Sequence, residues 1–229
     1  MFNIAPSSRL EHTEACRRTH AGRVAPRKAG AHSLQGNTIV SRGEWMEITP
    51  AVGKGRSCGT CTLCCKVLTV EELRKPNGQW CPHCVKGRGC AIYSDRPNEC
   101  RRFQCGYLLW PALGEHWLPA RSKLVVAYKP DGMEVIIHVD PGVPNAWRAE
   151  PYYSQIRSMA VQALGTAHTI FVQIGRRMIA VFPDREVDLG VVAEDEMIAI
   201  HEVTGPGTRR RDAVKLKADD PRINALRIV

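Results

Sequence analysis

The chain has 229 residues, of which 44% are hydrophobic and 24% are charged, a composition typical of a folded protein with a sizeable core. It contains no run of about 18 apolar residues, the length that a membrane helix needs, and its N-terminal residues lack the apolar stretch of a secretory signal. The sequence therefore argues against a membrane-spanning or secreted protein and predicts a cytoplasmic one.

The formal net charge of +9 is unevenly distributed along the chain. Residues 1–45 carry seven Lys or Arg against three Asp or Glu, residues 46–110 carry ten against five, and residues 111–229 carry fifteen of each. Thiolates that bind a metal would offset the surplus in the middle segment. The charge therefore gives little support to nucleic-acid binding, and we expect neither a nucleic-acid partner nor a membrane partner.

Residues 1–45 are rich in Arg, His, Ser, Ala and Gly and have no periodic pattern of apolar residues. We predict that this segment is a disordered N-terminal tail. Two alternatives stay open. The excess of Arg over acidic residues is also typical of an organellar transit peptide, and Met46 is a second candidate for the start of translation.

The second segment, residues 46–110, contains nine of the ten cysteines, and Cys16 is the exception. In the reducing cytosol, clustered thiols are more often metal ligands or redox groups than disulfides. This segment has few large apolar residues, while ordering a chain costs about 1.5 kcal/mol per residue. A bound metal can contribute about 10 kcal/mol of folding free energy. We therefore expect an irregular segment with short helices that a metal staples together.

Two short helices are expected in this second segment. The stretch Thr-Val-Glu-Glu at 69–72 resembles a capping box and predicts a helix that ends before the turn at 75–78. Another helix is expected from Asp95 to about Trp110, with Pro97 in its first turn.

The third segment, residues 111–229, has the pattern of an ordinary α+β module. Alternating and β-branched runs predict strands at 124–128, 135–139, 170–174, 178–182 and 197–203, and a 3.6-residue periodicity predicts a helix from about 151 to 163. His138 and His201 are interpreted as ordinary strand residues, and residues 209–211, three consecutive arginines, as a solvated loop. The predicted fold class is α+β, with the cysteine-rich segment docked on a small antiparallel-sheet and helix module.

The strongest motif is Cys58-Gly-Thr-Cys61-Thr-Leu-Cys64-Cys65, a CxxCxxCC run. Two-residue spacing lets both sulfurs of a CxxC turn converge on one metal centre, and CxxCxxC delivers three ligands to one four-iron cluster in bacterial ferredoxins. The side chain of Cys65 has to point away from that of Cys64, so further ligands are expected downstream. The downstream candidates are Cys81, His83, Cys84, Cys90, Cys100 and Cys105.

Nine thiols exceed what one tetrahedral zinc ion or one four-iron cluster uses, so either two centres exist or some thiols are spare. Three thiolates within seven residues suit a cluster better than a lone zinc ion, so a 4Fe–4S cluster is favoured over Zn. Trp80, Trp110 and Trp117 flank the cysteines and are expected to shield the centre from water.

Residues 58–105 resemble the YkgJ-like family of CxxCxxCC cysteine-cluster proteins, which is described as zinc- or iron-chelating. The resemblance rests on CGTCTLCC at 58–65, on Cys81, on GCAIYSDRPNEC at 89–100 and on CRRFQC at 100–105. It implies a bacterial origin and metal chelation, without a settled activity. The cysteines that match the family pattern are Cys58, Cys61, Cys64, Cys65, Cys81, Cys90, Cys100 and Cys105, whereas Cys84 and His83 are additions to it.

The expected function is metal binding, in the service of electron transfer, metal handling or the binding of a protein partner. A flagellin lysine methylase carries a similar cysteine motif, so an iron–sulfur enzyme that modifies a protein substrate is the alternative. The glycines Gly53, Gly55 and Gly59 follow no predicted strand, so they do not form the glycine-rich turn that would suit S-adenosylmethionine. The sequence assigns no catalytic residue.

Overall fold

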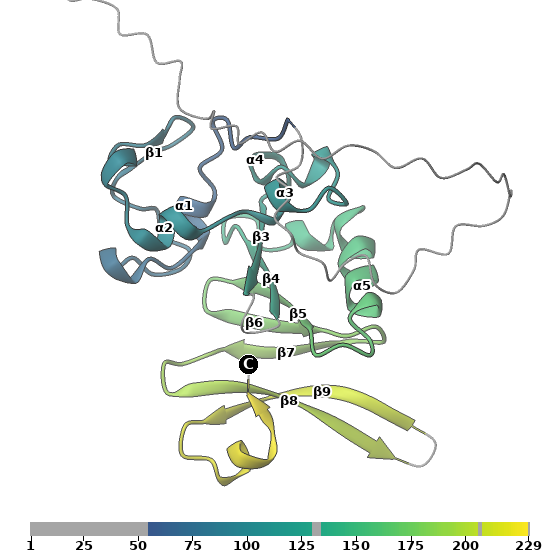
Figure 1. The fold of residues 1–229 in the computed structure, drawn as a ribbon. Helices are drawn as coiled ribbons and strands as arrows, with labels where there is room; N and C mark the ends of the chain where they lie inside the picture. Colours follow the sequence, from purple (N-terminus) through teal and green to yellow (C-terminus); the bar gives the residue numbers. More distant parts are fainter. Residues whose placement is uncertain (1–54, 130–133, 206–207, 229) are drawn as a thin grey trace, which may run out of the picture. The chain divides into compact units, whose positions relative to one another are not determined.

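The structure, a computed structural model, describes residues 55–129, 134–205 and 208–228 (Figure 1). All of the described residues belong to one compact unit. The predicted tail at 1–45, with Cys16, and the alternative start at Met46 lie outside the described residues.

The first part of the described chain contains short helices, with η marking the 3-10 type. They are α1 (Cys64–Val67), η1 (Glu71–Leu73), η2 (Tyr93–Asp95), α2 (Asn98–Arg102), α3 (Gly106–Leu109), η3 (Glu115–Trp117) and α4 (Pro119–Ser122). A small antiparallel hairpin pairs β1 (Cys84–Val85) with β2 (Gly89–Cys90). Of the nine cysteines at 58–105, Cys64, Cys65, Cys84, Cys90 and Cys100 lie within these short elements, Cys105 directly precedes α3, and Cys58, Cys61 and Cys81 lie in the connecting loops and turns.

The second part is dominated by strands. The central sheet has the strand order β3 (Leu124–Lys129), β4 (Glu134–Val139), β5 (Thr169–Ile174), β6 (Arg177–Val181) and β7 (Glu186–Val191). Strands β4 and β5 are parallel, whereas the other neighbours are antiparallel. A parallel pair needs a long crossover, and this crossover contains η4 (Ala146–Arg148) and α5 (Tyr152–Gln162).

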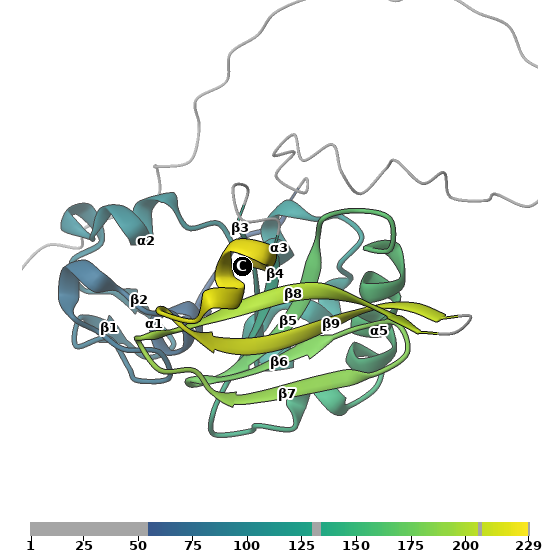
Figure 2. The same cartoon turned by 90° about the horizontal axis from the view of Figure 1, so that it is seen from below.

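An outer sheet covers one face of the central sheet. It has the order β10 (Arg227–Ile228), β8 (Glu196–Gly205) and β9 (Thr208–Lys217), and η5 (Pro221–Ala225) precedes β10. Figure 2 views the molecule from the side of this outer sheet. Ile198 and Ile200 of β8 belong to the same buried cluster as Phe171 and Ala180 of the central sheet. These contacts hold the two sheets together.

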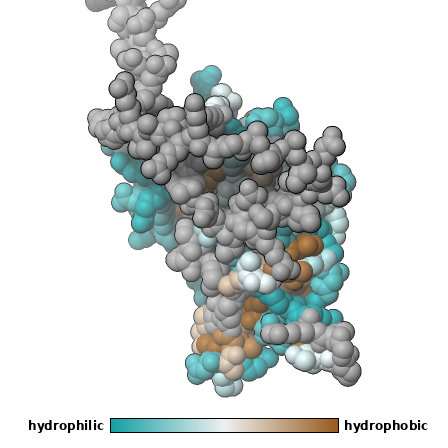
Figure 3. All heavy atoms as spheres, turned by 45° about the vertical axis from the view of Figure 1, so that its right-hand side comes forward, coloured by the Kyte–Doolittle hydropathy of each residue, from teal (hydrophilic) through white to brown (hydrophobic). Residues whose placement is uncertain are grey.

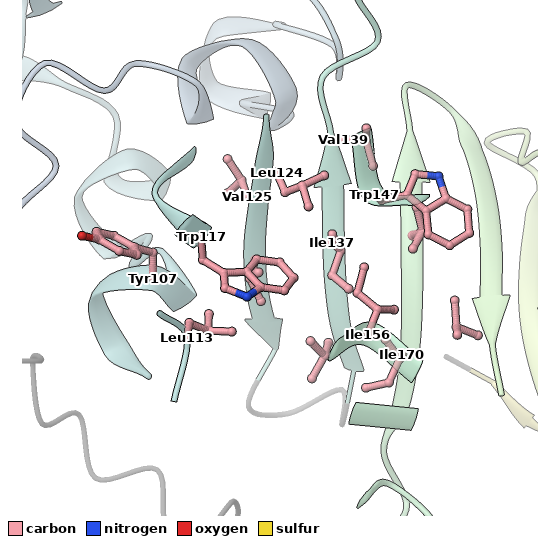
Figure 4. Packing of buried hydrophobic residues seen from close by; sticks show 14 of the residues in the cluster. Tyr107, Leu113, Trp117, Leu124, Val125, Ile137, Val139, Trp147, Ile156 and Ile170 are labelled. Carbon is pink, nitrogen blue, oxygen red and sulfur yellow. The ribbon is translucent and has the colours of Figure 1, made fainter. Parts of the chain in front are cut away.

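The period-two alternation of strand side chains separates two cores. On β5, Ile170 and Val172 face a first cluster, while Phe171 faces the cluster beneath the outer sheet. The first cluster lies on the helical side, where Trp147 and Ile156 pack on the sheet with 1% and 0% of their surface exposed (Figure 4). Because both faces of the central sheet are covered, every residue of β4 is buried.

The mixed α+β class, with short helices and mainly antiparallel sheets, is confirmed. The strands expected at 124–128, 135–139, 170–174, 178–182 and 197–203 are present to within a few residues, and the helix expected from 151 is α5. His138 lies in β4 and His201 in β8, as expected.

The lengths predicted for the two helices of the second segment are wrong. Only the 3-10 turn η1 forms after Thr69, because Val70 pairs with Lys75 in a β-bridge and Arg74 adopts a left-handed φ of 48°. The helix expected at 95–110 is split into α2 and α3, since Phe103 and Cys105 are extended, with ψ of 127° and 135°. The break directs Cys105 towards the central sheet.

One further expectation is corrected. The three arginines at 209–211 lie in β9, opposite residues 202–204 of β8, and are not a loop. Arg211 is held there by hydrogen bonds from its guanidinium to the His168 carbonyl and the Thr169 hydroxyl, at 2.8 and 2.7 Å. Trp117 is a core residue, 1% exposed, with its Nε1 atom donating to Gln155 at 2.5 Å, and it belongs to the same buried cluster as Cys105.

Candidate metal centre

The CxxCxxCC run folds as a tight turn that leads into α1. The amide of Cys61 donates to the carbonyl of Cys58 at 2.9 Å, and the amide of Cys65 donates to the carbonyl of Thr62 at 3.0 Å. Leu63 and Val67, which are 6% and 1% exposed, belong to the core on the helical side of the central sheet. Burial of these two aliphatic side chains anchors the cysteine turn to the sheet.

The second group of cysteines is attached to the first through the backbone. The amide of Cys81 donates to the carbonyl of Cys65 at 2.9 Å, and the amide of Cys84 donates to the carbonyl of Cys81 at 3.0 Å. In the β1–β2 hairpin, Cys84 lies directly opposite Cys90. These bonds bring three separate stretches of the motif beside α1.

The last two cysteines lie on either side of the helix break. Cys100 lies within α2, and Cys105 is the residue before α3 and is buried. Helix α3 approaches β3 so closely that a Cβ atom on Gly106 would lie 2.9 Å from the Cβ of Val126. The Cys105 thiol therefore lies against the edge strand of the central sheet, where the backbone groups of Tyr107 and Val126 hydrogen-bond to it.

Cys65 lies at the centre of the largest group of thiols. Its side chain is within hydrogen-bond range of the Cys64 thiol, contrary to the expectation that it points away, and also of the Cys84 thiol. The interaction with Cys64 and burial raise the pKa of Cys65 well above its ordinary value, while the hydrogen bond with Cys84 and the charge of Lys75 act in the opposite direction. Burial, followed by the charge of Cys65, raises the pKa of Cys84 to about 11. Burial also raises the pKa of Cys100, and Cys65, Cys81 and Cys90 act on it electrostatically in the same direction.

A second neighbourhood contains Cys58, Cys61 and Cys105. Burial raises the pKa of Cys105 to about 11, with Cys58 and Cys61 adding to the rise and the backbone hydrogen bonds opposing it. Burial likewise raises the pKa of Cys58, and Cys61 and Cys65 contribute. Cys65 therefore interacts with both neighbourhoods. At neutral pH the thiols of Cys58, Cys65 and Cys105 are protonated until a cation or a cluster displaces the proton.

Lys75 is a buried cation beside these thiols. It is 4% exposed, and its ammonium donates to the carbonyl of Lys66 at 2.8 Å and to the carbonyl of Leu68. Burial lowers its pKa, while four neighbouring thiols act in the opposite direction: Cys81, Cys65, Cys64 and Cys100. A positive charge held here favours the ionised form of the thiols around it.

One side chain near the cysteines is a candidate ligand that the sequence did not predict. Glu99, beside Cys100 in α2, was not predicted as a ligand, yet its Oε2 atom is buried and has no hydrogen-bond partner among the described residues. A buried carboxylate oxygen in this state is a candidate ligand. Its sequence signal, one acidic residue next to a cysteine, is too common to be specific. The His83 carbonyl accepts from the amide of Ala91 at 2.8 Å, which gives this residue a role in the hairpin.

The donor set has the chemistry of a zinc or iron–sulfur site, since thiolates are the preferred ligands of both and a carboxylate also binds zinc. The cysteines at 58–105 are all free thiols. Within residues 55–129, 134–205 and 208–228, no group of three or more His, Cys, Asp or Glu side chains is close enough to hold a metal ion. The residues are thus of the types that bind these metals, and a closed set of ligands would require side-chain rearrangement.

Comparison with models of protein families, with curated proteins and with solved structures found no match. In the described part of the chain, the longest helix is α5 with 11 residues, and no helix has the length and apolar character to cross a bilayer.

Proposed function

We propose that the cysteine segment, residues 58–105, binds metal, either an iron–sulfur cluster or zinc. The observation that supports this most is the gathering of free thiols from three stretches of chain around Cys65 and the buried Lys75. Thiols that serve only as small apolar residues do not need a buried ammonium among them. The proposed ligands are Cys58, Cys61, Cys64, Cys65, Cys81, Cys90, Cys100 and Cys105, with Cys84 as a further candidate.

The backbone contacts of Cys105 are compatible with a cluster or with zinc, and the CxxCxxC spacing favours the cluster. Amide hydrogen bonds to a ligand sulfur tune the reduction potential of an iron–sulfur cluster, and Cys105 accepts such bonds from Tyr107 and Val126. A bound cluster would supply one-electron chemistry, and zinc would supply structural rigidity without redox activity. On this proposal the chain is an electron carrier, with metal handling and partner binding as the other roles that its metal could serve.

Metal analysis of the full chain, purified without oxygen, tests the proposal. We expect iron with an equal amount of acid-labile sulfide, and visible absorption that bleaches on reduction. Stoichiometric zinc with no visible absorption would support metal binding but would contradict a role in electron transfer. Protein that retains no transition metal, and takes up none when iron and sulfide or Zn²⁺ are supplied under reducing conditions, would disprove the proposal.

The Lys75→Met variant tests the role of the buried ammonium. Methionine keeps the apolar stem but removes the charge and the donor to two carbonyls. We expect metal affinity to fall by about 10- to 100-fold, the usual effect of removing a group that supports metal ligands. The measurement is competition for Zn²⁺ against a chromophoric chelator.

The matched control for this variant is Lys86→Met. Lys86 lies in the same segment and is exposed, with its ammonium 4.9 Å from the centre of the Trp80 ring. The Lys86→Met change removes the same charge but disrupts no buried hydrogen bond. Equal affinities in the two variants would show that the Lys75 ammonium does not support the thiols.

A further inference from the structure

One carboxylate of the cysteine segment lacks the water or the partners that a charged group normally has. Hydrophilic side chains cover much of the described surface on the face that Figure 3 shows. The Oε2 atom of Glu99 in α2 is instead buried and has no hydrogen-bond partner among the described residues. No described Lys or Arg forms an ion pair with Glu99. A buried carboxylate oxygen in this state is costly unless a cation compensates it.

Helix α2 places Glu99 on the same side as Cys100. Of the five residues of this helix, Asn98, Arg101 and Arg102 are exposed, whereas Glu99 and Cys100 are half-buried. The two half-buried residues are neighbours in the sequence and lie about 100° apart around the helix axis. The inner side of α2 is therefore formed by one carboxylate and one thiol.

The thiols that lie near this side of α2 come from other stretches of the chain. Three of them act electrostatically on Cys100, as Glu99 does: Cys65, Cys81 and Cys90. Cys65 is already within hydrogen-bond range of two other thiols. Cys81 and Cys90, both half-buried, are the remaining partners for Cys100. The carboxylate of Glu99 thus belongs to a neighbourhood with three thiols.

We propose that Glu99 is the oxygen ligand of a site for one divalent metal ion, with Cys81, Cys90 and Cys100 as its thiolate ligands. Three thiolates and one carboxylate complete the tetrahedron that zinc prefers. A four-iron cluster is held by cysteines, so the carboxylate favours zinc or a similar single ion at this site. Within the described residues these side chains do not form a closed group, so they rotate towards the ion when it binds.

This inference rests on the proposed function, metal binding by the cysteine segment, and assigns the ion and the ligands of one centre. The nine thiols at 58–105 exceed what one centre uses. The cysteines of the CxxCxxCC turn therefore stay available for an iron–sulfur cluster.

Titration of the full chain with Co²⁺ tests the assignment. The chain is first freed of metal with a chelator and kept reduced. Co²⁺ accepts the ligands of zinc, its charge-transfer bands report bound thiolates, and its ligand-field bands shift when an oxygen ligand is replaced. Glu99→Gln keeps the size of the side chain and removes its charge. We expect this variant to bind one Co²⁺ at least about tenfold more weakly, since even groups that only support the ligands contribute this much. At saturation its ligand-field bands should be shifted and its thiolate bands unchanged.

The matched control is Glu71→Gln. Glu71 lies in η1 of the same segment and is exposed, so the change removes the same charge from the surface. The Co²⁺ affinity and the spectrum of this variant should equal those of the unmodified chain.

The same titration separates the ways in which the inference can fail. An unchanged affinity and spectrum in Glu99→Gln would overturn the assignment of Glu99 and leave metal binding intact. Loss of all thiolate bands in this variant would also overturn it, because Glu99 would then support the fold of the segment instead of binding one ion. Absence of thiolate bands from the unmodified chain would contradict metal binding itself, and the inference with it.

Discussion

Replacing Cys65 by serine should release most of the bound metal. Serine has nearly the same size, but its hydroxyl stays protonated and is a poor ligand for iron or zinc. Cys65 is within hydrogen-bond range of the thiols of Cys64 and Cys84 and interacts electrostatically with Cys58 and Cys100. Loss of its sulfur therefore affects both neighbourhoods of thiols. The measurement is the metal-to-protein ratio after anaerobic purification.

Other single cysteine variants complete this test. Cys58→Ser, Cys61→Ser and Cys64→Ser should also lose most of the metal, because they remove ligands from the CxxCxxCC turn. Cys84→Ser is the informative variant, since Cys84 lies outside the family pattern yet its thiol is beside Cys65. Retention of metal by this variant would show that Cys84 is not a metal ligand. Cys16→Ser is the control and should lose none.

One outcome would contradict the proposed metal centre. If the double variant Cys58→Ser with Cys61→Ser retains all of the metal, the turn does not supply ligands and the proposed centre is wrong. Partial loss in each single variant, with further loss in the double variant, would instead agree with two centres that share the thiols.

Removal of the metal should increase amide hydrogen exchange in the cysteine segment and leave the central sheet largely protected. The elements that carry the cysteines are at most five residues long and bury few apolar side chains, so their order depends on the metal. Strands β4 and β5 are covered on both faces, so their order does not depend on the metal. Hydrogen exchange measured by mass spectrometry, with and without a chelator, compares the two regions.

The reference peptide for this measurement is α5, whose Ile156 is 0% exposed in the core on the helical side of the sheet. Its exchange should be the same in both states. Exchange that rises equally in α5, in β4 and around Cys65 after chelation would show that metal and sheet unfold as one unit, contrary to this expectation.

Much of the sheet could be predicted because each strand is encoded by a pattern of residues within the strand itself. The run at 135–139 is apolar and β-branched on both faces, which is the pattern of a covered strand, and β4 is buried throughout. The helix α5 follows from the spacing of Ile156 and Ala160, which are its buried residues. The cysteine spacing likewise predicted the turn in which Cys61 bonds to Cys58.

The parts that could not be predicted depend on contacts between distant residues. The parallel pairing of β4 with β5 is set by the crossover through α5, which no local pattern encodes. The arginines at 209–211 resemble a loop by composition, yet the ladder with β8 and the bonds of Arg211 make them a strand. Strand β7 was missed because its residues are only partly buried and Gly190 has a left-handed φ of 66°.

The sharing of one core by the cysteine segment and the sheet limits how this motif can be transplanted. Leu63 and Val67 of the CxxCxxCC turn and Tyr107 after the last cysteine are all buried in the cluster that contains Val125 and Val126 of β3. A graft of residues 58–110 into another scaffold would expose these side chains to water and would leave the Cys105 thiol without its hydrogen bond from Val126. The smallest transferable unit therefore includes β3 and the strand that pairs with it.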